Sequence, residues 1–161
     1  MCGIAGLLDL ARTNADASLQ RIVHDMVATL HHRGPDDTGT WVDQECGVAL
    51  GHKRLSVVDL SPLGHQPMLS SSGRYCVSYN GEVYNHGELR LELQERGYSF
   101  RGRSDTEVLV EAIDCWGISD TLRRSNGMFA IAVWDTQLRR LTLARDRIGI
   151  KPLYYGWSGS T

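Results

Sequence analysis

The spacing of apolar residues along the chain switches between the periods of helices and strands. One stretch repeats its apolar positions at intervals of three and four, which predicts a helix with a single buried stripe. The stripe consists of Leu19, Ile22, Val23, Met26, Val27 and Leu30. Two further helices are predicted to begin at Asn85 and Ser104, because a glutamate follows each three residues later, as in a capping box. Gly97 and Gly117 stand where these helices are expected to end.

Shorter apolar runs predict strands. They cover Gly3 to Leu10, Thr38 to Val42, Cys46 to Leu50 with a continuation into residues 51–59, Tyr75 to Tyr79, Met128 to Trp134 and Leu141 to Ala144. The fourth of these strands is expected to end on Asn80-Gly81, a pair that is common in turns. Many strands with helices grouped between them predict an α+β layered domain. At 161 residues the chain has the length of one such domain.

Composition narrows the classes of function. A formal net charge of -2 gives no basic surface for nucleic acid. The longest wholly apolar run, Met128 to Trp134, is far too short to span a membrane, and the N-terminus does not resemble a signal peptide. The four cysteines form no C-x-x-C pair and the histidines no H-E-x-x-H motif, so we expect no disulfide framework and no metal site. We therefore expect a cytoplasmic protein whose partners are small molecules or proteins.

The second residue, Cys2, is the first candidate for chemistry. Removal of the initiator methionine, which is normal when the second residue is small, would leave Cys2 with both a thiol and a free α-amine. An unperturbed α-amine titrates near ~7.7–8.0 and a thiol near ~8.5, so the amine can accept the thiol proton at neutral pH. A chain that keeps Met1 lacks that amine. Taken alone, Cys2 is better explained as a small, partly buried residue at the start of a strand.

Four other residues carry groups suited to an α-amino acid. Arg54, at the predicted end of a strand, can bind a carboxylate, although an ordinary surface arginine is the simpler interpretation of any single arginine. Asp105, in the first turn of a helix, can hold an ammonium group, although capping alone would explain it. Asn80 and Gly81 can donate a side-chain amide and a backbone N–H to an oxyanion. With Cys2, these groups are what hydrolysis of an amino acid's side-chain amide requires.

These residues belong to a series of motifs in a fixed order. The motifs are MCGIAG (1–6), HRGPD (32–36), RLSVVD (54–59), YNGEVYN (79–85), SDTE (104–107), GMFA (127–130) and ARDRIGIKPLYY (144–155). The chain thereby resembles the glutaminase domain of class II glutamine amidotransferases, which are N-terminal nucleophile hydrolases. Within that family it is most similar to the asparagine synthetase branch. The motifs span nearly the whole chain, and as a set they are highly specific.

The resemblance implies a fold and a set of residue roles. The fold is a four-layer αββα sandwich with two central, mostly antiparallel sheets. The implied roles are Cys2 as nucleophile, Arg54 on the glutamine carboxylate, Asp105 on its ammonium group, and Asn80 with Gly81 at the oxyanion. The glutamine pocket is further implied to be lined by Leu55, Ser56, Val57, Val58 and Glu82. The motifs at 32–36 and 145–152 are implied to be structural or interdomain, without a catalytic role.

The implied reaction is attack of the Cys2 thiolate on the glutamine δ-carbonyl, loss of ammonia to give a thioester, and hydrolysis to glutamate. No cofactor is expected for this step. In asparagine synthetases the ammonia passes to a second domain, which uses ATP and magnesium to amidate aspartate. We expect residues 1–161 to be the glutaminase domain, truncated at its C-terminal end, with the synthetase domain as its partner and a homodimer as one arrangement of the full chain.

Two alternatives remain open at the level of sequence. A glutamine amidotransferase of the same branch could amidate another acceptor, such as a cell-surface sugar or a natural product. A non-hydrolysing glutamine-binding module is the other alternative, although relatives that have lost hydrolysis usually lose the cysteine, and Cys2 is present.

Overall fold

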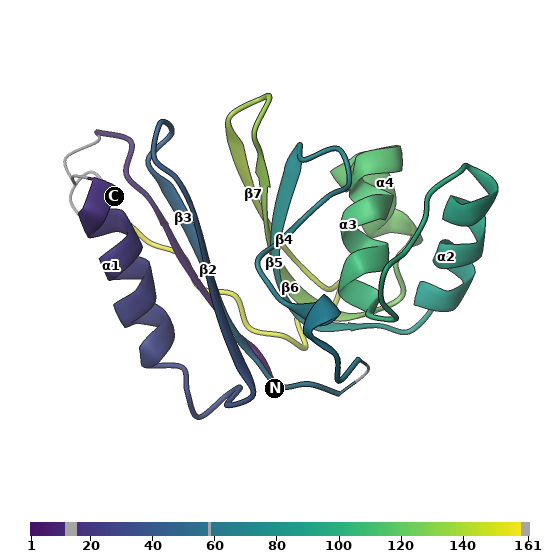
Figure 1. Cartoon of the computed structure of the whole chain (residues 1–161), viewed down its shortest axis with the longest axis horizontal. Helices are drawn as coiled ribbons and strands as arrows, with labels where there is room; N and C mark the ends of the chain where they lie inside the picture. Colours follow the sequence, from purple (N-terminus) through teal and green to yellow (C-terminus); the bar gives the residue numbers. More distant parts are fainter. Residues whose placement is uncertain (12–15, 58, 159–161) are drawn as a thin grey trace.

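Two antiparallel sheets lie face to face between helical layers in the computed structural model, which describes residues 1–11, 16–57 and 59–158 (Figure 1). The first sheet has the strand order β1-β3-β2 and the second the order β4-β5-β6-β7. The strands are β1 (Gly3–Leu8), β2 (Asp37–Asp43), β3 (Val48–Arg54), β4 (Met68–Leu69), β5 (Tyr75–Val83), β6 (Gly127–Asp135) and β7 (Arg140–Arg145). The helices are α1 (Asp16–Ala28), α2 (His86–Glu95), α3 (Asp105–Trp116) and α4 (Ile118–Arg124), with a single 3-10 turn at Pro62–Gly64.

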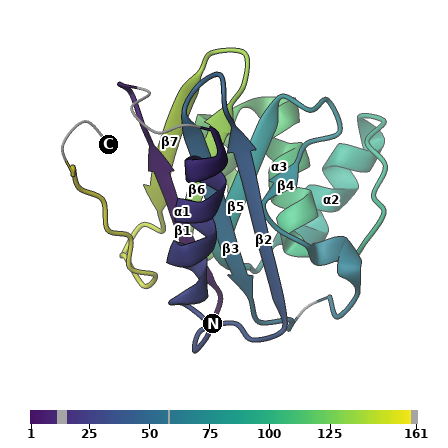
Figure 2. The same ribbon diagram turned by 60° about the vertical axis from the view of Figure 1, so that its left-hand side comes forward.

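Helix α1 forms the outer layer over the first sheet (Figure 2). Its predicted stripe faces that sheet, where Val23 and Val27 pack on Ala49 of β3. Gly51, also on β3, lets the helix approach closely, because a Cβ at this position would lie 2.2 Å from a methyl group of Val27. The outer edge of β1 has no neighbouring strand within the described chain, since β1 ends the order of its sheet.

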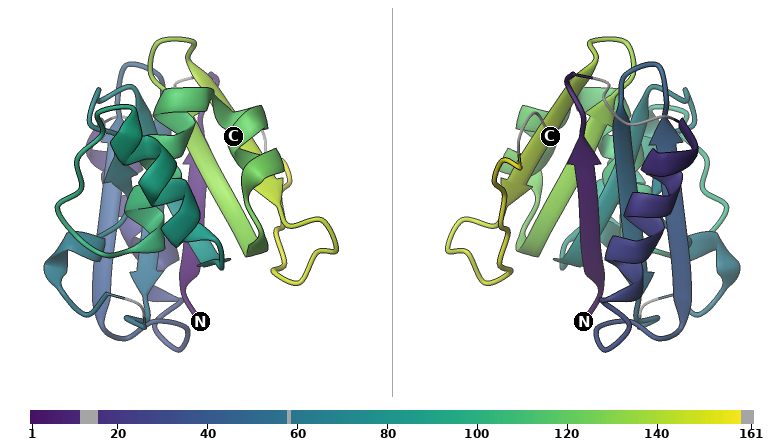
Figure 3. Two further views of the ribbon diagram at one scale, coloured as in Figure 1. Left: turned by 90° about the vertical axis from the view of Figure 1, so that its right-hand side faces the viewer. Right: turned by 90° about the vertical axis from the view of Figure 1, so that its left-hand side faces the viewer.

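The second sheet has the larger core. Helix α3 packs on its outer face, with α2 and α4 against α3 (Figure 3). The buried face of α3 consists of Leu109, Ala112 and Ile113, which belong to one cluster with Val77 and Ile131 of the sheet. This arrangement confirms the four-layer αββα fold expected from the resemblance. None of the described helices is long and apolar enough to cross a membrane.

The two sheets meet through an apolar region and a polar one. Leu50 of β3 packs against Trp134 of β6 in the apolar region. Nearer the end of β3, the Ser78 hydroxyl donates to the carbonyl of Gly51 at 3.0 Å, and His52 Nε2 lies 3.0 Å from the carbonyl oxygen of Tyr79. Burial lowers the pKa of His52 to about 4, against the opposing effect of that hydrogen bond. The imidazole is therefore neutral at pH 7 and ties β3 to β5.

The structure corrects several local predictions. Strand β5 runs to Val83, so Asn80 and Gly81 lie inside a strand and the predicted turn there is wrong. The cap predicted for α3 is confirmed, since the Ser104 hydroxyl accepts the N–H of Glu107. Asn85 precedes α2 but its side chain makes no capping hydrogen bond. The short elements β4 and α4 were not predicted from the sequence.

Candidate active site

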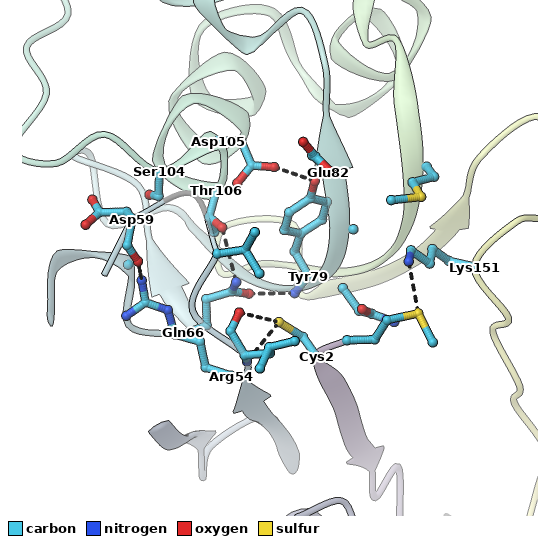
Figure 4. A pocket seen from close by; sticks show the side chains of 17 residues that line it. Cys2, Arg54, Asp59, Gln66, Tyr79, Glu82, Ser104, Asp105, Thr106 and Lys151 are labelled. Atoms are coloured by element: carbon cyan, nitrogen blue, oxygen red, sulfur yellow. Dashed lines mark hydrogen bonds between the residues drawn. The ribbon is translucent and has the colours of Figure 1, made fainter. Parts of the chain in front are cut away.

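A pocket of about 170 Å³ opens where β1 begins and β3 ends (Figure 4). It brings together eight of the predicted site residues from four separate parts of the chain. They are Cys2, Arg54, Leu55, Val57, Asn80, Gly81, Glu82 and Asp105. Ser56 does not line the pocket, and its N–H donates to Asp36 Oδ2 at 2.8 Å. Val58 lies outside the described residues.

Three contacts hold Cys2 in place directly before the start of β1. Arg33 Nε donates to its carbonyl oxygen at 3.0 Å, which fixes the backbone. Its Sγ lies 3.4 Å from the backbone nitrogen of Leu55 and 3.7 Å from the carbonyl oxygen of the same residue. The thiol is partly exposed and forms one wall of the pocket. The strand pairing explains this placement, because Gly3 is opposite Lys53 and the next residue on β3 is Arg54.

Arg54 is the last residue of β3 and is 7 % exposed. Its Nη1 donates to the carbonyl of Ser61 at 2.8 Å, and its Nη2 donates to the carbonyl of Asp59. A guanidinium has five N–H donors, so three remain after these two bonds. Gly64 makes room for the group, because a Cβ there would lie 2.1 Å from Arg54 Nη2. Arg54 therefore holds the loop after β3 while its remaining donors are available to the pocket.

Asp59 fixes the same loop from within. Its Oδ1 accepts the N–H of Ser61 at 2.8 Å, and its Oδ2 accepts the N–H of Arg103 at 2.9 Å. Hydrogen bonds from Ser61 and from the Arg103 backbone lower the pKa of Asp59 to about 2. This carboxylate is ionised at neutral pH and connects the loop to the segment that leads into α3.

Asp105 begins α3 and is 6 % exposed. Its Oδ2 accepts two hydrogen bonds, from the Tyr79 hydroxyl at 2.8 Å and from the Val83 N–H at 3.0 Å. Burial first, and then the charge of Asp105, raise the pKa of Tyr79 well above its usual range, so the phenol stays protonated and keeps donating. Since both bonds fall on Oδ2, Oδ1 is left to accept a donor in the pocket.

The edge of β5 supplies two neutral donors. Tyr79 N–H points away from β6, to Gln66 Oε1, and Val83 N–H points away from it, to Asp105. N–H groups of alternate residues share one edge of a strand, so the Gly81 N–H between them also points away from β6 and toward the pocket. The Asn80 side-chain amide makes no hydrogen bond within the described chain, although Asn80 is only 5 % exposed. Both groups are free to bind an oxygen atom.

The backbone at position 81 leaves no room for a side chain. A Cβ at this position would lie 2.2 Å from the carbonyl oxygen of Met128 on the neighbouring strand. The functional interpretation of Asn80 and Gly81 is thus compatible with a strand, although the turn expected there is absent.

Sequence reasoning missed several residues that line the same pocket. They include Met1, Asp59, Gln66, Tyr79, Ser104, Thr106, Met128 and Lys151. Lys151 is 5 % exposed and its Nζ lies 3.2 Å from Met1 Sδ. The turn that carries it is held by Asp146, which accepts the N–H groups of Ile150 and Lys151. Only the motif at 144–155 pointed to this lysine, and that motif was interpreted as structural.

The described residues contain no group of three or more His, Cys, Asp or Glu side chains that could hold a metal ion. The pocket instead combines a thiol, a buried guanidinium, a buried carboxylate and two neutral N–H donors. Such a set can bind both charged groups of an α-amino acid and hold a carbonyl next to a nucleophile.

Comparisons with known proteins point to one family. A family model described as a glutamine amidotransferase domain matches residues 1–161. "Asparagine synthetase [glutamine-hydrolyzing] 3" of Bacillus subtilis is 42% identical over 163 residues, which cover 100% of this chain and 26% of that protein. "Asparagine synthetase [glutamine-hydrolyzing] 2" of the same organism is 39% identical, covering 96% of this chain and 20% of that protein. The chain thus spans about a quarter or less of these relatives.

A solved structure supports the fold. The glutamine phosphoribosylpyrophosphate amidotransferase of B. subtilis superposes with a TM-score of 0.74, over 98% of this chain and 39% of the other. The two sequences are 21% identical, so this likeness concerns the architecture alone.

Proposed function

The chain belongs to the family of glutamine amidotransferase domains, and we propose that it hydrolyses glutamine to glutamate and ammonia through a thioester on Cys2. The observation that carries the proposal is the convergence of Cys2, Arg54, Asn80, Gly81 and Asp105 in one pocket, although they come from distant parts of the chain.

The ends of the pocket suit the two charged groups of glutamine. Arg54 has free guanidinium donors for the α-carboxylate, and Asp105 Oδ1 can accept the α-ammonium group. Glu82 adds a second carboxylate at the ammonium end, and Leu55 and Val57 give apolar contacts to the methylene groups. A substrate bound by these groups extends its side-chain amide toward Cys2.

The chemistry follows from the groups around Cys2. In a chain that has lost Met1, the α-amine of Cys2 takes the thiol proton, and the sulfur attacks the δ-carbonyl carbon of glutamine. The C–N bond breaks, the nitrogen takes up the proton and leaves as ammonia, and a thioester remains. Water then attacks the thioester, which releases glutamate and restores the thiol.

Each attack places a negative charge on the former carbonyl oxygen. The Asn80 amide and the Gly81 N–H are neutral donors held in place by a strand, so they stabilise this charge without having to reorganise. Removing one such donor costs about 10²–10³ in kcat in other hydrolases.

In a longer protein we propose that the ammonia is used to amidate aspartate, a reaction suggested by the similarity to glutamine-hydrolysing asparagine synthetases. That step requires ATP and magnesium, which we assign to a synthetase domain outside residues 1–161. A different acceptor is not favoured by these relatives. We further propose that the protein works in the cytoplasm and that the full chain can form a homodimer.

The test is to incubate the protein with glutamine and to follow glutamate and ammonia. We expect equal amounts of both products and alkylation of Cys2 by an electrophilic glutamine analogue, such as 6-diazo-5-oxo-norleucine, detected by peptide mass spectrometry. Protein that keeps Met1 is the matched control and should be inactive. Glutamine that binds without any product would favour a binding module instead.

A further inference from the structure

Gln66 is a buried polar residue that the chemistry described above does not use. It is 4 % exposed and lines the same pocket as Cys2. Its Oε1 accepts the N–H of Tyr79 at 2.7 Å, and its Nε2 donates to the Thr106 hydroxyl at 3.1 Å. One side chain thus connects the loop after β3, the edge of β5 and the first turn of α3 (Figure 4).

The bond to Tyr79 lies where the sheet stops. Strand β4 pairs with β5 only at Leu69 opposite Cys76 and at Met68 opposite Val77. Continued in the same register, the ladder would next place the backbone of Gln66 opposite Tyr79, but the pairing ends at Met68. The next N–H on this edge belongs to Tyr79, and the Gln66 side chain satisfies it in place of a backbone carbonyl.

Beyond that bond the same edge faces the pocket. The Gly81 N–H is the next donor along it, two residues on, and it has no strand partner on this side. If β4 continued, its backbone would take this N–H away from the substrate. Gln66 therefore closes the ladder at the last position that still leaves Gly81 available.

The side-chain nitrogen of Gln66 makes the contact with α3, through the Thr106 hydroxyl. Thr106 follows Asp105 directly, and the Tyr79 hydroxyl donates to Asp105. Gln66 thus accepts a hydrogen bond from Tyr79 and donates one to Thr106, and each of these two residues is adjacent to a group of the proposed site. Removing the Gln66 amide would leave the buried Tyr79 N–H unpaired, which a strand edge tolerates only by shifting.

We propose that Gln66 is a positioning residue, whose side-chain amide holds the Gly81 donor and the Asp105 carboxylate in the spacing that glutamine requires. The inference rests on the proposed glutamine hydrolysis and extends it. It assigns the two ends of one side chain to two steps: the Tyr79 bond to stabilisation of the oxyanion, and the Thr106 bond to capture of the substrate.

The two roles are expected to affect different kinetic parameters, kcat for the oxyanion and KM for capture of the substrate. Gln66→Met keeps the length of the side chain but removes both bonds, so we expect kcat to fall about 5- to 20-fold, less than for outright loss of an oxyanion donor. Thr106→Val removes only the acceptor for Nε2, so we expect KM for glutamine to rise roughly threefold while kcat stays within about twofold. Ser78→Ala is the control, because it removes a buried hydrogen bond, to the Gly51 carbonyl, outside the pocket.

Measurements on the full-length protein decide the outcome. A loss of kcat in Gln66→Met that exceeds the loss in Ser78→Ala, at matched fractions of folded protein, supports the inference. Equal effects of these two variants, or an unchanged kcat in Gln66→Met, would overturn it, because Gln66 would then contribute only to stability.

Hydrogen exchange separates this inference from the proposed function. We expect the Tyr79 amide to exchange at least about 10-fold faster in Gln66→Met than in the parent, while amides of α2 keep their rates. An unchanged Tyr79 rate would overturn the positioning role even in an active enzyme. A parent that hydrolyses no glutamine would refute the proposed function instead, and the exchange result would still decide whether Gln66 fixes this edge.

Discussion

The two sheets contribute different kinds of groups to one pocket. The first sheet provides Cys2 at the beginning of β1 and Arg54 at the end of β3, so both stand at the ends of strands. The second provides Asn80 and Gly81 within β5, and Asp105 in the first turn of the helix packed on it. The nucleophile and the guanidinium proposed to bind the carboxylate lie at strand ends, whereas the two neutral donors lie inside a strand.

The hydrophobic cores between each sheet and its outer helices also differ, in their size. Behind the first sheet, the buried cluster consists of Val23, Val27 and Ala49. Behind the second, a much larger cluster joins β5 and β6 to α2 and α3. Fixed donors depend on a rigid frame, because their contribution comes from not having to reorganise. The comparison indicates that the second sheet, with α2 and α3, forms a rigid frame, and that the first sheet places the nucleophile Cys2 next to this frame.

The largest expected effect comes from removing the nucleophile. Cys2→Ala should lower glutaminase kcat by more than about 10³-fold and leave the unfolding midpoint in urea nearly unchanged, because the side chain packs little. Cys115→Ala, a change on α3 away from the pocket, is the matched control and should keep its activity. Substantial turnover by Cys2→Ala would mean that the nucleophile has been misassigned.

The contact between the sheets should make stability depend on pH. The folded pKa of His52, about 4, is below the unfolded value of about 6.5, so the unfolded chain binds more protons between these values. Stability should therefore fall as pH drops from 6.5 to 4, by about 3 kcal/mol from this group alone. His52→Gln keeps a hydrogen-bond donor but does not titrate. The unfolding free energy of this variant, measured in urea, should change less between pH 6.5 and pH 4 than that of the parent. An equal change in both proteins would contradict the assignment of this pH dependence to His52.

The carboxylate of Asp105, on the helix packed against the second sheet, should matter for binding of the substrate. Asp105→Asn should lower kcat/KM for glutamine about 10- to 150-fold, because a charge-assisted hydrogen bond to the α-ammonium group is lost. Glutaramate lacks that amine, so the parent and the variant should use it equally poorly. Asp114→Asn is the control, since Asp114 also accepts a bond from a tyrosine, Tyr98, at 3.4 Å. Equal losses for both substrates would show that Asp105 acts only through packing.

The smallest effect is expected at the start of α3. Ser104→Ala removes the hydroxyl that accepts the Glu107 N–H, which should cost about 1 kcal/mol of unfolding free energy. Ser104→Asp should retain the cap and most of the stability, since aspartate caps as well as serine. Urea unfolding of the three proteins makes this comparison, and a destabilised Ser104→Asp would argue against capping as the cause.

Local sequence signals predicted the frame better than the details of the site. The α3 cap at Ser104 and the strand end at Arg54 depend on neighbouring residues, and the structure confirms both. The layered fold followed from the strand and helix pattern together with the family resemblance. The Asn80-Gly81 turn was wrong because pairing with β6 outweighs the local preference of these residues for turns.

Two of the missed residues, Gln66 and Lys151, have partners far away in the chain. Gln66 contacts residues 13 and 40 positions later, so no local pattern shows its role. Lys151 reaches the pocket through a contact with Met1 that spans 150 positions. The catalytic roles of Cys2 and its neighbours remain predictions, because proximity in a pocket does not measure reactivity.

The anchoring of Cys2 has a consequence for the order of events during biosynthesis. Met1 and Cys2 lie directly before β1, and in the folded protein the Cys2 carbonyl is bound by Arg33 while its sulfur contacts Leu55. An aminopeptidase must take an extended N-terminus into its own cleft, and this one is held at both the backbone and the side chain. Leu55 is synthesised dozens of residues after Cys2, so the N-terminus is free while the first strand leaves the ribosome. Maturation of the nucleophile is therefore best completed on the nascent chain, before β3 exists to capture it.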